Sequence, residues 1–248
     1  MKMGGSLRAI AMAAAGMAAI ASTPAFAQEE EASGPLDVSA NVGVYSDYRF
    51  RGVSLNLEDF AVQGGIDLSY AVSDSVSLYV GNWNSNLNKN AGYGNTEVDL
   101  YGGATGKIGS VGWKLGGVSY LYPNQSNVDY YELQAELNGT VGPLTVAGGT
   151  FIAPKQVNYG NKTGKYFYTN ASIGIPNTPV TLKASLGHED NAFFNNKLDW
   201  SLGASVSWKV LTFGVSYIDT NRTVPYTQGG HLRDAADGTV VFNLTATF

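Results

Sequence analysis

Cysteine is absent from the 248-residue chain. Small secreted domains commonly depend on disulfide bonds, so this chain must be held together in another way, such as backbone hydrogen bonding over a large sheet. Charged residues make up only 14% of the sequence and form no basic patch, which gives little support to nucleic-acid binding. The two histidines, His188 and His231, are far apart and do not provide zinc-ligand spacing. We therefore expect no metal and no cofactor.

The chain also lacks an apolar run of the roughly 20 residues that a spanning helix needs. The apolar run at 9–20 follows the basic residues Lys2 and Arg8 and precedes Ala25-Phe26-Ala27. This order of basic, apolar and small-residue segments is typical of a secretory signal peptide. We expect a signal peptide at 1–27, a short acidic segment at 28–36 and one domain at 37–248. Without Lys2 and Arg8, 13 basic and 20 acidic residues remain.

Glycine and aromatic residues are abundant, with 31 Gly, 15 Tyr and 10 Phe. The segment 38–52 alternates, because its even positions are mostly apolar whereas the odd positions carry Asp47, Arg49 and Arg51. Alternation of this kind is typical of a strand with one apolar face. Since a chain without a spanning helix can cross a membrane only as a closed barrel, we predict an all-β fold, a transmembrane antiparallel up-and-down β-barrel.

The same period of two recurs along the chain and predicts about twelve strands of the length that crosses an outer membrane. In the third strand the apolar face fails at Asn82 and Asn84, and a bulge near Gly81 would explain the change of face. The expected strands lie near 38–51, 60–71, 76–86, 95–107, 111–122, 130–140, 144–153, 165–175, 180–189, 197–209, 211–219 and 238–248.

The connections between these segments alternate in length. Those at 72–75, 108–110, 141–143, 176–179 and near 210 are short, whereas those at 52–59, 87–94, 123–129, 154–164, 190–196 and 220–237 are longer and polar. Outer-membrane barrels have short periplasmic turns and long outer loops. The even strand count then places both termini on the periplasmic side.

Aromatic residues gather at the ends of the predicted strands, on the apolar face. Two such girdles anchor a barrel at the membrane interfaces, although aromatics also favour strands in general. The expected interface aromatics are Tyr48, Phe50, Phe60, Tyr131, Phe167 and Trp200 at the outer ends, and Tyr70, Trp113, Trp208 and Phe248 at the inner ends.

Charged and tyrosine side chains on the opposite face are expected to line the lumen. One interpretation is a basic cluster that faces acids across a narrow pore and selects solutes. The alternative is a set of ion pairs that fills the barrel and holds it shut; for Arg51, a contact with lipopolysaccharide phosphate is a further alternative. The candidate pore-lining residues are Asp47, Arg49, Arg51, Asp67, Glu97, Asp99, Tyr101, Tyr130, Glu132, Glu136, Lys197 and Asp199.

Residues 41–54, NVGVYSDYRFRGVS, and residues 61–67, AVQGGID, resemble the opening of the TorF family of porin-like proteins, also catalogued as Gcw_chp proteins. The last eleven residues, GTVVFNLTATF, resemble the end of that family. The sequence departs from the family pattern at Leu55, where a polar residue is usual. The resemblance implies an outer-membrane barrel over the whole mature chain, with Phe248 as a signal for the barrel-assembly machinery.

These observations favour a porin-like channel of the bacterial outer membrane for passive diffusion of small polar solutes or ions, with a weak cation preference because acids outnumber bases in the lumen set. Its expected partners are outer-membrane lipid and lipopolysaccharide, and we expect no nucleic acid. A closed structural or adhesive barrel is the first alternative. A lipid-modifying enzyme is the second, but His188 and Ser185 fall on opposite faces of their strand, so we expect no enzyme.

The cleavage-site pattern predicts that the mature protein begins at Gln28. N-terminal sequencing of material from the outer-membrane fraction should give Gln28 as the first residue. Recovery of the intact Met1-Lys2 terminus would contradict export through a cleaved signal peptide.

Overall fold

The structure is a computed structural model that describes residues 35–248. The predicted signal peptide and residues 28–34 of the acidic segment lie outside the described residues. None of the helices in 35–248 is long and apolar enough to cross a membrane.

Twelve antiparallel strands form one closed barrel, which confirms the predicted fold class and strand count. The barrel closes because β1 pairs with β4 along one edge and with β16 along the other, where Val44 lies opposite Leu244. The strands are β1 (Leu36–Tyr45), β4 (Ala61–Ser73), β5 (Val76–Asn86), β6 (Thr96–Ile108), β7 (Val111–Leu121), β8 (Tyr130–Val141), β9 (Leu144–Ala153), β10 (Gly164–Gly174), β11 (Val180–Asp190), β12 (Lys197–Trp208), β13 (Leu211–Thr220) and β16 (Thr239–Thr247).

The outer wall of the barrel is apolar. On β4, for example, Val62, Ile66 and Leu68 are exposed, whereas Gln63 is buried and Asp67 is half-buried inside the barrel. A soluble protein would not expose aliphatic side chains over a whole wall, but a lipid bilayer solvates such a wall well. The barrel is therefore an outer-membrane β-barrel, with its polar side chains in the lumen.

Glycines on the lumen side make room for tyrosine rings from neighbouring strands. A Cβ atom at Gly187 on β11 would collide with the ring of Tyr166 on β10, and one at Gly81 on β5 would collide with the ring of Tyr101 on β6. Each tyrosine can thus lie flat against the wall instead of crossing the lumen. This packing accounts for part of the high glycine and tyrosine content.

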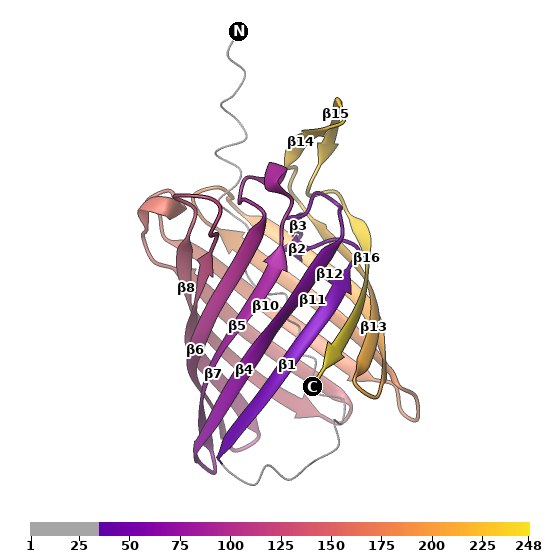
Figure 1. The fold of residues 1–248 in the computed structure, drawn as a ribbon. Coiled ribbons are helices and arrows are strands. Elements are labelled where there is room, and N and C mark those ends of the chain that lie inside the picture. Colours follow the sequence, from indigo (N-terminus) through magenta and orange to yellow (C-terminus); the bar gives the residue numbers. More distant parts are fainter. Residues whose placement is uncertain (1–34) are drawn as a thin grey trace.

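The two ends of the barrel differ, as Figure 1 shows. One end has short turns, such as the one between β8 and β9, where Val141 and Leu144 are directly paired. The other end has the long loops, which contain the 3-10 helices η1 (Lys89–Ala91) and η2 (Val157–Tyr159) and the hairpin β14 (Pro225–Gln228) and β15 (His231–Asp234). We take the long-loop end as the outer end.

The prediction of a first strand at 38–51 was wrong at its outer end. β1 ends at Tyr45, and residues 47–57 fold into the barrel as a small hairpin of β2 (Arg49–Phe50) and β3 (Val53–Ser54). The backbone turns at Arg51 and Gly52, which have φ angles of 45° and 85°. Burial of apolar side chains such as Phe50 and Leu55 stabilises the inward position. We call residues 47–57 the plug.

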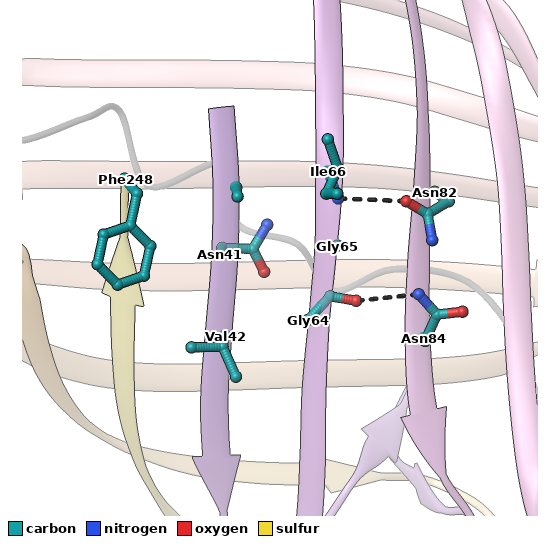
Figure 2. A pocket seen from close by; sticks show the side chains of 9 residues that line it. Asn41, Val42, Gly64, Gly65, Ile66, Asn82, Asn84 and Phe248 are labelled. Carbon is teal, nitrogen blue, oxygen red and sulfur yellow. Dashed lines mark hydrogen bonds between the residues drawn. The ribbon is translucent and has the colours of Figure 1, made fainter. Parts of the chain in front are cut away.

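The predicted bulge near Gly81 was also wrong. The register between β4 and β5 is regular there, and its only irregularity lies between Ala71 and Ser73. Asn82 and Asn84 consequently lie on the outer wall, beside a shallow hollow near Phe248 (Figure 2). Their amides form hydrogen bonds with β4: Ile66 N donates to Asn82 Oδ1 at 3.3 Å, and Asn84 Nδ2 donates to Gly64 O at 3.4 Å. Bonding to the backbone lowers the cost of placing these amides against lipid.

The topology predicts which positions a reagent can reach from outside the cell. Because the chain has no cysteine, a single Leu232→Cys variant in β15 should react on intact cells with a maleimide too large to cross the outer membrane. Asp74→Cys, in the short turn between β4 and β5, is the matched control and should react only after lysis. The reverse pattern of labelling would show that the barrel is inverted.

Candidate functional site

The plug fills the outer part of the lumen, and all of its residues from Asp47 to Leu57 are buried. It is held in shape by its own contacts. Arg49 Nε donates to Asp47 Oδ2 at 2.7 Å, and Ser54 Oγ donates to Asp47 Oδ1 at 2.6 Å. Leu55 N donates to Tyr48 O at 2.8 Å. The plug is thus a compact unit with its own internal ion pair.

The outer loop between β13 and β16 covers the plug. Ser54 N donates to Ala235 O at 2.8 Å, and Arg49 Nη1 donates to Asp237 O at 2.5 Å. A small apolar cluster continues this contact and consists of Val53 and Leu57 from the plug with Val224, Tyr226, Ala235 and Ala236 from the loop. The longest outer loop and the plug therefore form one packed layer.

Arg51, at the tip of the plug, reaches across the lumen to two carboxylates. Its Nη2 lies 2.7 Å from Glu132 Oε2 on β8, and its Nη1 lies 2.7 Å from Glu189 Oε1 on β11. The guanidinium also lies over the Tyr166 ring, 4.0 Å from the ring centroid. Burial alone would lower the pKa of Arg51, but the carboxylates of Glu132 and Glu189 raise it above its ordinary value, so the guanidinium stays charged.

The ion pairs continue along the wall beyond Arg51. Lys197 Nζ on β12 lies 2.6 Å from Glu189 Oε2 and 3.7 Å from Asp199 Oδ2. Tyr166 Oη donates to Asp199 Oδ1 at 3.0 Å. A continuous network of alternating charge therefore runs from Glu132 through the plug to Asp199.

Glu97 and Asp99 stand apart from this network. They follow each other on the inner face of β6, both are fully buried, and neither forms a salt bridge within residues 35–248. Glu97 Oε1 accepts a weak hydrogen bond from Tyr48 Oη of the plug at 3.4 Å. Glu97 Oε2 and both carboxylate oxygens of Asp99 accept none from the described residues. Burial without a basic partner disfavours the charged form of a carboxyl group, so Glu97 and Asp99 differ from the paired acids of the network.

The inner part of the lumen is polar and half-buried. Tyr101 Oη donates to Asp67 Oδ1 at 2.6 Å, and Tyr168 Oη donates to Glu136 Oε2 at 2.7 Å. Lys114 lies over the Tyr79 ring, with Nζ 4.7 Å from the centroid. Acidic and basic groups are more evenly matched at this level than around the plug.

The candidate pore-lining residues lie inside the barrel, but some project from the strands of the wall and others belong to the plug. Asp67, Glu97, Asp99, Tyr101, Tyr130, Glu132, Glu136, Lys197 and Asp199 project inward from strands. The prediction that the first strand carries Asp47, Arg49 and Arg51 was wrong, because these residues belong to the plug. Glu189 was missed, although its parity on β11, opposite to that of His188, could have revealed it.

Two of the predicted interface aromatics do not lie at the membrane interface. Tyr48 and Phe50 are buried in the plug, because β1 ends before them, and Tyr48 packs edge-on against Trp83 inside the lumen. Six of the others are exposed on the outer wall: Phe60, Tyr70, Tyr131, Phe167, Trp208 and Phe248. Trp113 and Trp200 are half-buried there.

The arrangement around His188 gives little support to hydrolysis. His188 Nε2 lies 3.3 Å from Asn196 Oδ1, and its cross-strand neighbours are Phe167 and Leu198, which are not nucleophiles. Ser185 lies inside the barrel, where its hydroxyl bonds to that of Ser201 at 2.7 Å. Within residues 35–248, no cluster of three or more His, Asp or Glu side chains could hold a metal ion.

A closed barrel with an apolar outer wall and a charged lumen defines the class as an outer-membrane β-barrel of porin-like architecture. Residues 29–248 match the family described as "Bacterial protein of unknown function (Gcw_chp)", and the chain belongs to that family. No curated protein matches the chain. The name TorF, which the sequence resemblance suggested, stays a prediction.

Solved structures support the fold. The KdgM porin superposes with a TM-score of 0.53 at 9% identity, over 85% of this chain and 98% of that chain. The NanC porin gives 0.54 at 10% identity, over 86% and 99%. Outer membrane phospholipase A from Escherichia coli gives 0.52 at 10% identity, over 85% and 89%. At such low identity these likenesses establish the fold alone.

Loss of one carboxylate from the Arg51 contacts should loosen the plug. Glu132→Gln removes a two-pronged charged contact whose hydrogen bonds are each worth about 1.5–3 kcal/mol, so amide hydrogen exchange across residues 47–57 should become about tenfold faster or more. Glu136→Gln is the matched control, because Glu136 lies on the same face of β8 and contacts Tyr168, not the plug. Equal exchange rates in the two variants would contradict the role of Glu132.

Proposed function

We propose that the protein is a channel for passive diffusion of small polar solutes and ions across the outer membrane, with a weak preference for cations. The observation that supports this most is the lumen itself, which carries half-exposed charged and hydroxyl groups over its inner half and buried charged groups around the plug, inside an apolar outer wall. A barrel that served only as a membrane anchor would have no need of half-buried, polar groups over its inner half. The porin likenesses in fold agree with this proposal.

The cation preference follows from the charges around the plug. Six carboxyl groups lie there, against the three bases Arg49, Arg51 and Lys197, and the four with basic partners or donors are Asp47, Glu132, Glu189 and Asp199; the other two are Glu97 and Asp99. Charges inside a narrow, poorly solvated lumen act more strongly than charges in bulk water. A local excess of acid attracts small cations and repels large anions. The acids that have basic partners or hydrogen-bond donors should contribute most, because burial disfavours the charged form of a carboxyl group without a basic partner, as at Glu97 and Asp99.

A closed structural or adhesive barrel is the second candidate, and the burial of the plug favours it. All plug residues are buried, and the Arg51 ion pairs join the plug to β8 and β11. In the channel proposal, this state is the resting state, and conduction requires the tip of the plug to move. In the structural proposal, the plug never leaves.

Two partners belong to the same proposal. Phe248 is exposed on the outer wall at the end of β16, a position from which the barrel-assembly machinery could read it. Lipopolysaccharide would surround the outer end, where exposed loop bases such as Arg233 and Lys162 lie. Arg51 is not available to it, because its side chain is buried.

The cation preference is tested by the zero-current potential of single channels in a salt gradient. Glu132→Gln with Asp199→Asn removes two acids that have basic partners and should shift this potential toward anions. Asp74→Asn in the inner turn is the control and should leave it nearly unchanged. An unchanged potential in the Glu132 and Asp199 variant would refute their role in selectivity, and no conductance in the parent protein would favour the closed barrel.

A further inference from the structure

The wall residues that bind Arg51, namely Glu132, Glu189 and Tyr166, are held in place by contacts that do not involve Arg51. Tyr120 Oη donates to Glu132 Oε2 at 3.1 Å. Lys197 Nζ and Asn191 Nδ2 donate to Glu189 at 2.6 and 3.1 Å. Tyr166 is held by its bond to Asp199 and by its position over Gly187. Four side chains from neighbouring strands and loops, together with the space at Gly187, thus keep the two acceptors and the ring in place if Arg51 leaves.

The geometry of this wall matches a planar guanidinium better than an ammonium group. Both terminal nitrogens of Arg51 are used, since Nη2 contacts Glu132 and Nη1 contacts Glu132 and Glu189. The plane also lies against the Tyr166 ring. An ammonium group is a compact point charge that cannot form the fork and the stack at the same time.

One nitrogen of Arg51 is left over. Its Nε is buried and has no hydrogen-bond partner among the described residues. The contacts therefore involve only the two terminal nitrogens, and none of them involves Nε, the nitrogen that carries the substituent. Any guanidinium with a single substituent could satisfy the same contacts.

The backbone of Arg51 has an unfavourable conformation. Its φ of 45° lies in the left-handed region, which non-glycine residues rarely adopt. Gly52 follows at 85°, and a Cβ atom there would approach the backbone oxygen of Asp219 to 3.0 Å. The contacts of the side chain must outweigh this strain, so a soluble ligand with the same head group can compete with Arg51.

We propose that Glu132, Glu189 and Tyr166 form a binding site for monosubstituted guanidinium compounds, and that Arg51 occupies this site as an intramolecular ligand while the plug is in place. A solute with a free guanidinium group displaces Arg51 and loosens the tip of the plug. Binding does not depend on the proposed function, whereas the consequence for conduction rests on it.

Binding is tested with the purified, folded barrel of the Arg51→Ala variant, in which the site is vacant. Methylguanidinium at millimolar concentration, far below denaturing levels, should raise the temperature at which the barrel unfolds on a heat-modifiability gel. From these shifts, its affinity should be about tenfold higher than that of methylammonium, which lacks the planar fork. Equal shifts with both cations, or no shift with either, would overturn the site.

Three further variants make this result specific. The double variant Arg51→Ala with Glu132→Gln should lose the methylguanidinium effect. Arg49→Ala, which removes a plug arginine that pairs within the plug, should show a much smaller effect than Arg51→Ala, because Arg51 still competes for the site. If Arg51→Ala does not fold, Arg51→Lys keeps a charge opposite the carboxylates and should also bind methylguanidinium in preference to methylammonium. Retention of the effect in the double variant would contradict the assignment.

The channel is tested separately with the parent protein in a planar bilayer. Methylguanidinium on the outer side should increase the open probability in a saturable manner, and equal methylammonium should not. If methylguanidinium binds to Arg51→Ala but the parent conducts no ions with or without it, the site stands and the proposed function fails. If the parent conducts and methylguanidinium leaves the open probability unchanged, displacement of Arg51 does not control the plug, and that part of the inference fails.

Discussion

Every backbone polar group of a strand that lies in lipid must find its hydrogen-bond partner within the protein, and this requirement governs the whole structure. An open edge at β1 would leave a row of amide and carbonyl groups in hydrocarbon. Pairing between β1 and β16 removes both edges at once, and the reciprocal bonds between Ala40 and Phe248 extend the pairing to the last residue. Closure of twelve strands then creates an interior that must hold either side chains or water.

The inner and outer halves of the barrel fill this interior in different ways. In the inner half, polar side chains stay half-exposed, and tyrosines lie flat over glycines of the next strand. In the outer half, the plug brings its own apolar side chains and both of its arginines into the lumen. Residues that would otherwise form an outer loop thus become the core of the molecule.

Burial of so many charges is tolerable only because most of them are paired. Arg51 joins the carboxylates of Glu132 on β8 and Glu189 on β11, and Lys197 extends the pairing to Asp199. Removal of one partner from a buried ion pair costs about 3–5 kcal/mol, because the other charge is left without compensation. The same physics makes Arg51 the most sensitive point of the plug, and it disfavours the charged forms of Glu97 and Asp99, which have no basic partner.

The sequence by itself determined the barrel, the strand count and the side of the wall on which most residues lie. A period of two is a local property, since neighbouring side chains in a strand point to opposite faces whatever the rest of the chain does. The lengths of the connections are equally visible in the sequence. Placement of Asp67, Glu132 and Lys197 in the lumen could therefore be predicted.

The plug was decided by the tertiary structure. Residues 46–51 continue the alternation of β1, so nothing local distinguishes a strand in the wall from a hairpin in the lumen. Their inward fold is stabilised by partners that are remote in the sequence, namely Glu132, Glu189 and the loop around Ala235. The position of Asn82 and Asn84 was also decided by the tertiary structure. The regular pairing of β5 with β4 puts these two polar side chains on the outer wall. Local periodicity fixes which side chains share a face, whereas the closed sheet fixes which chain segments fill the space it encloses.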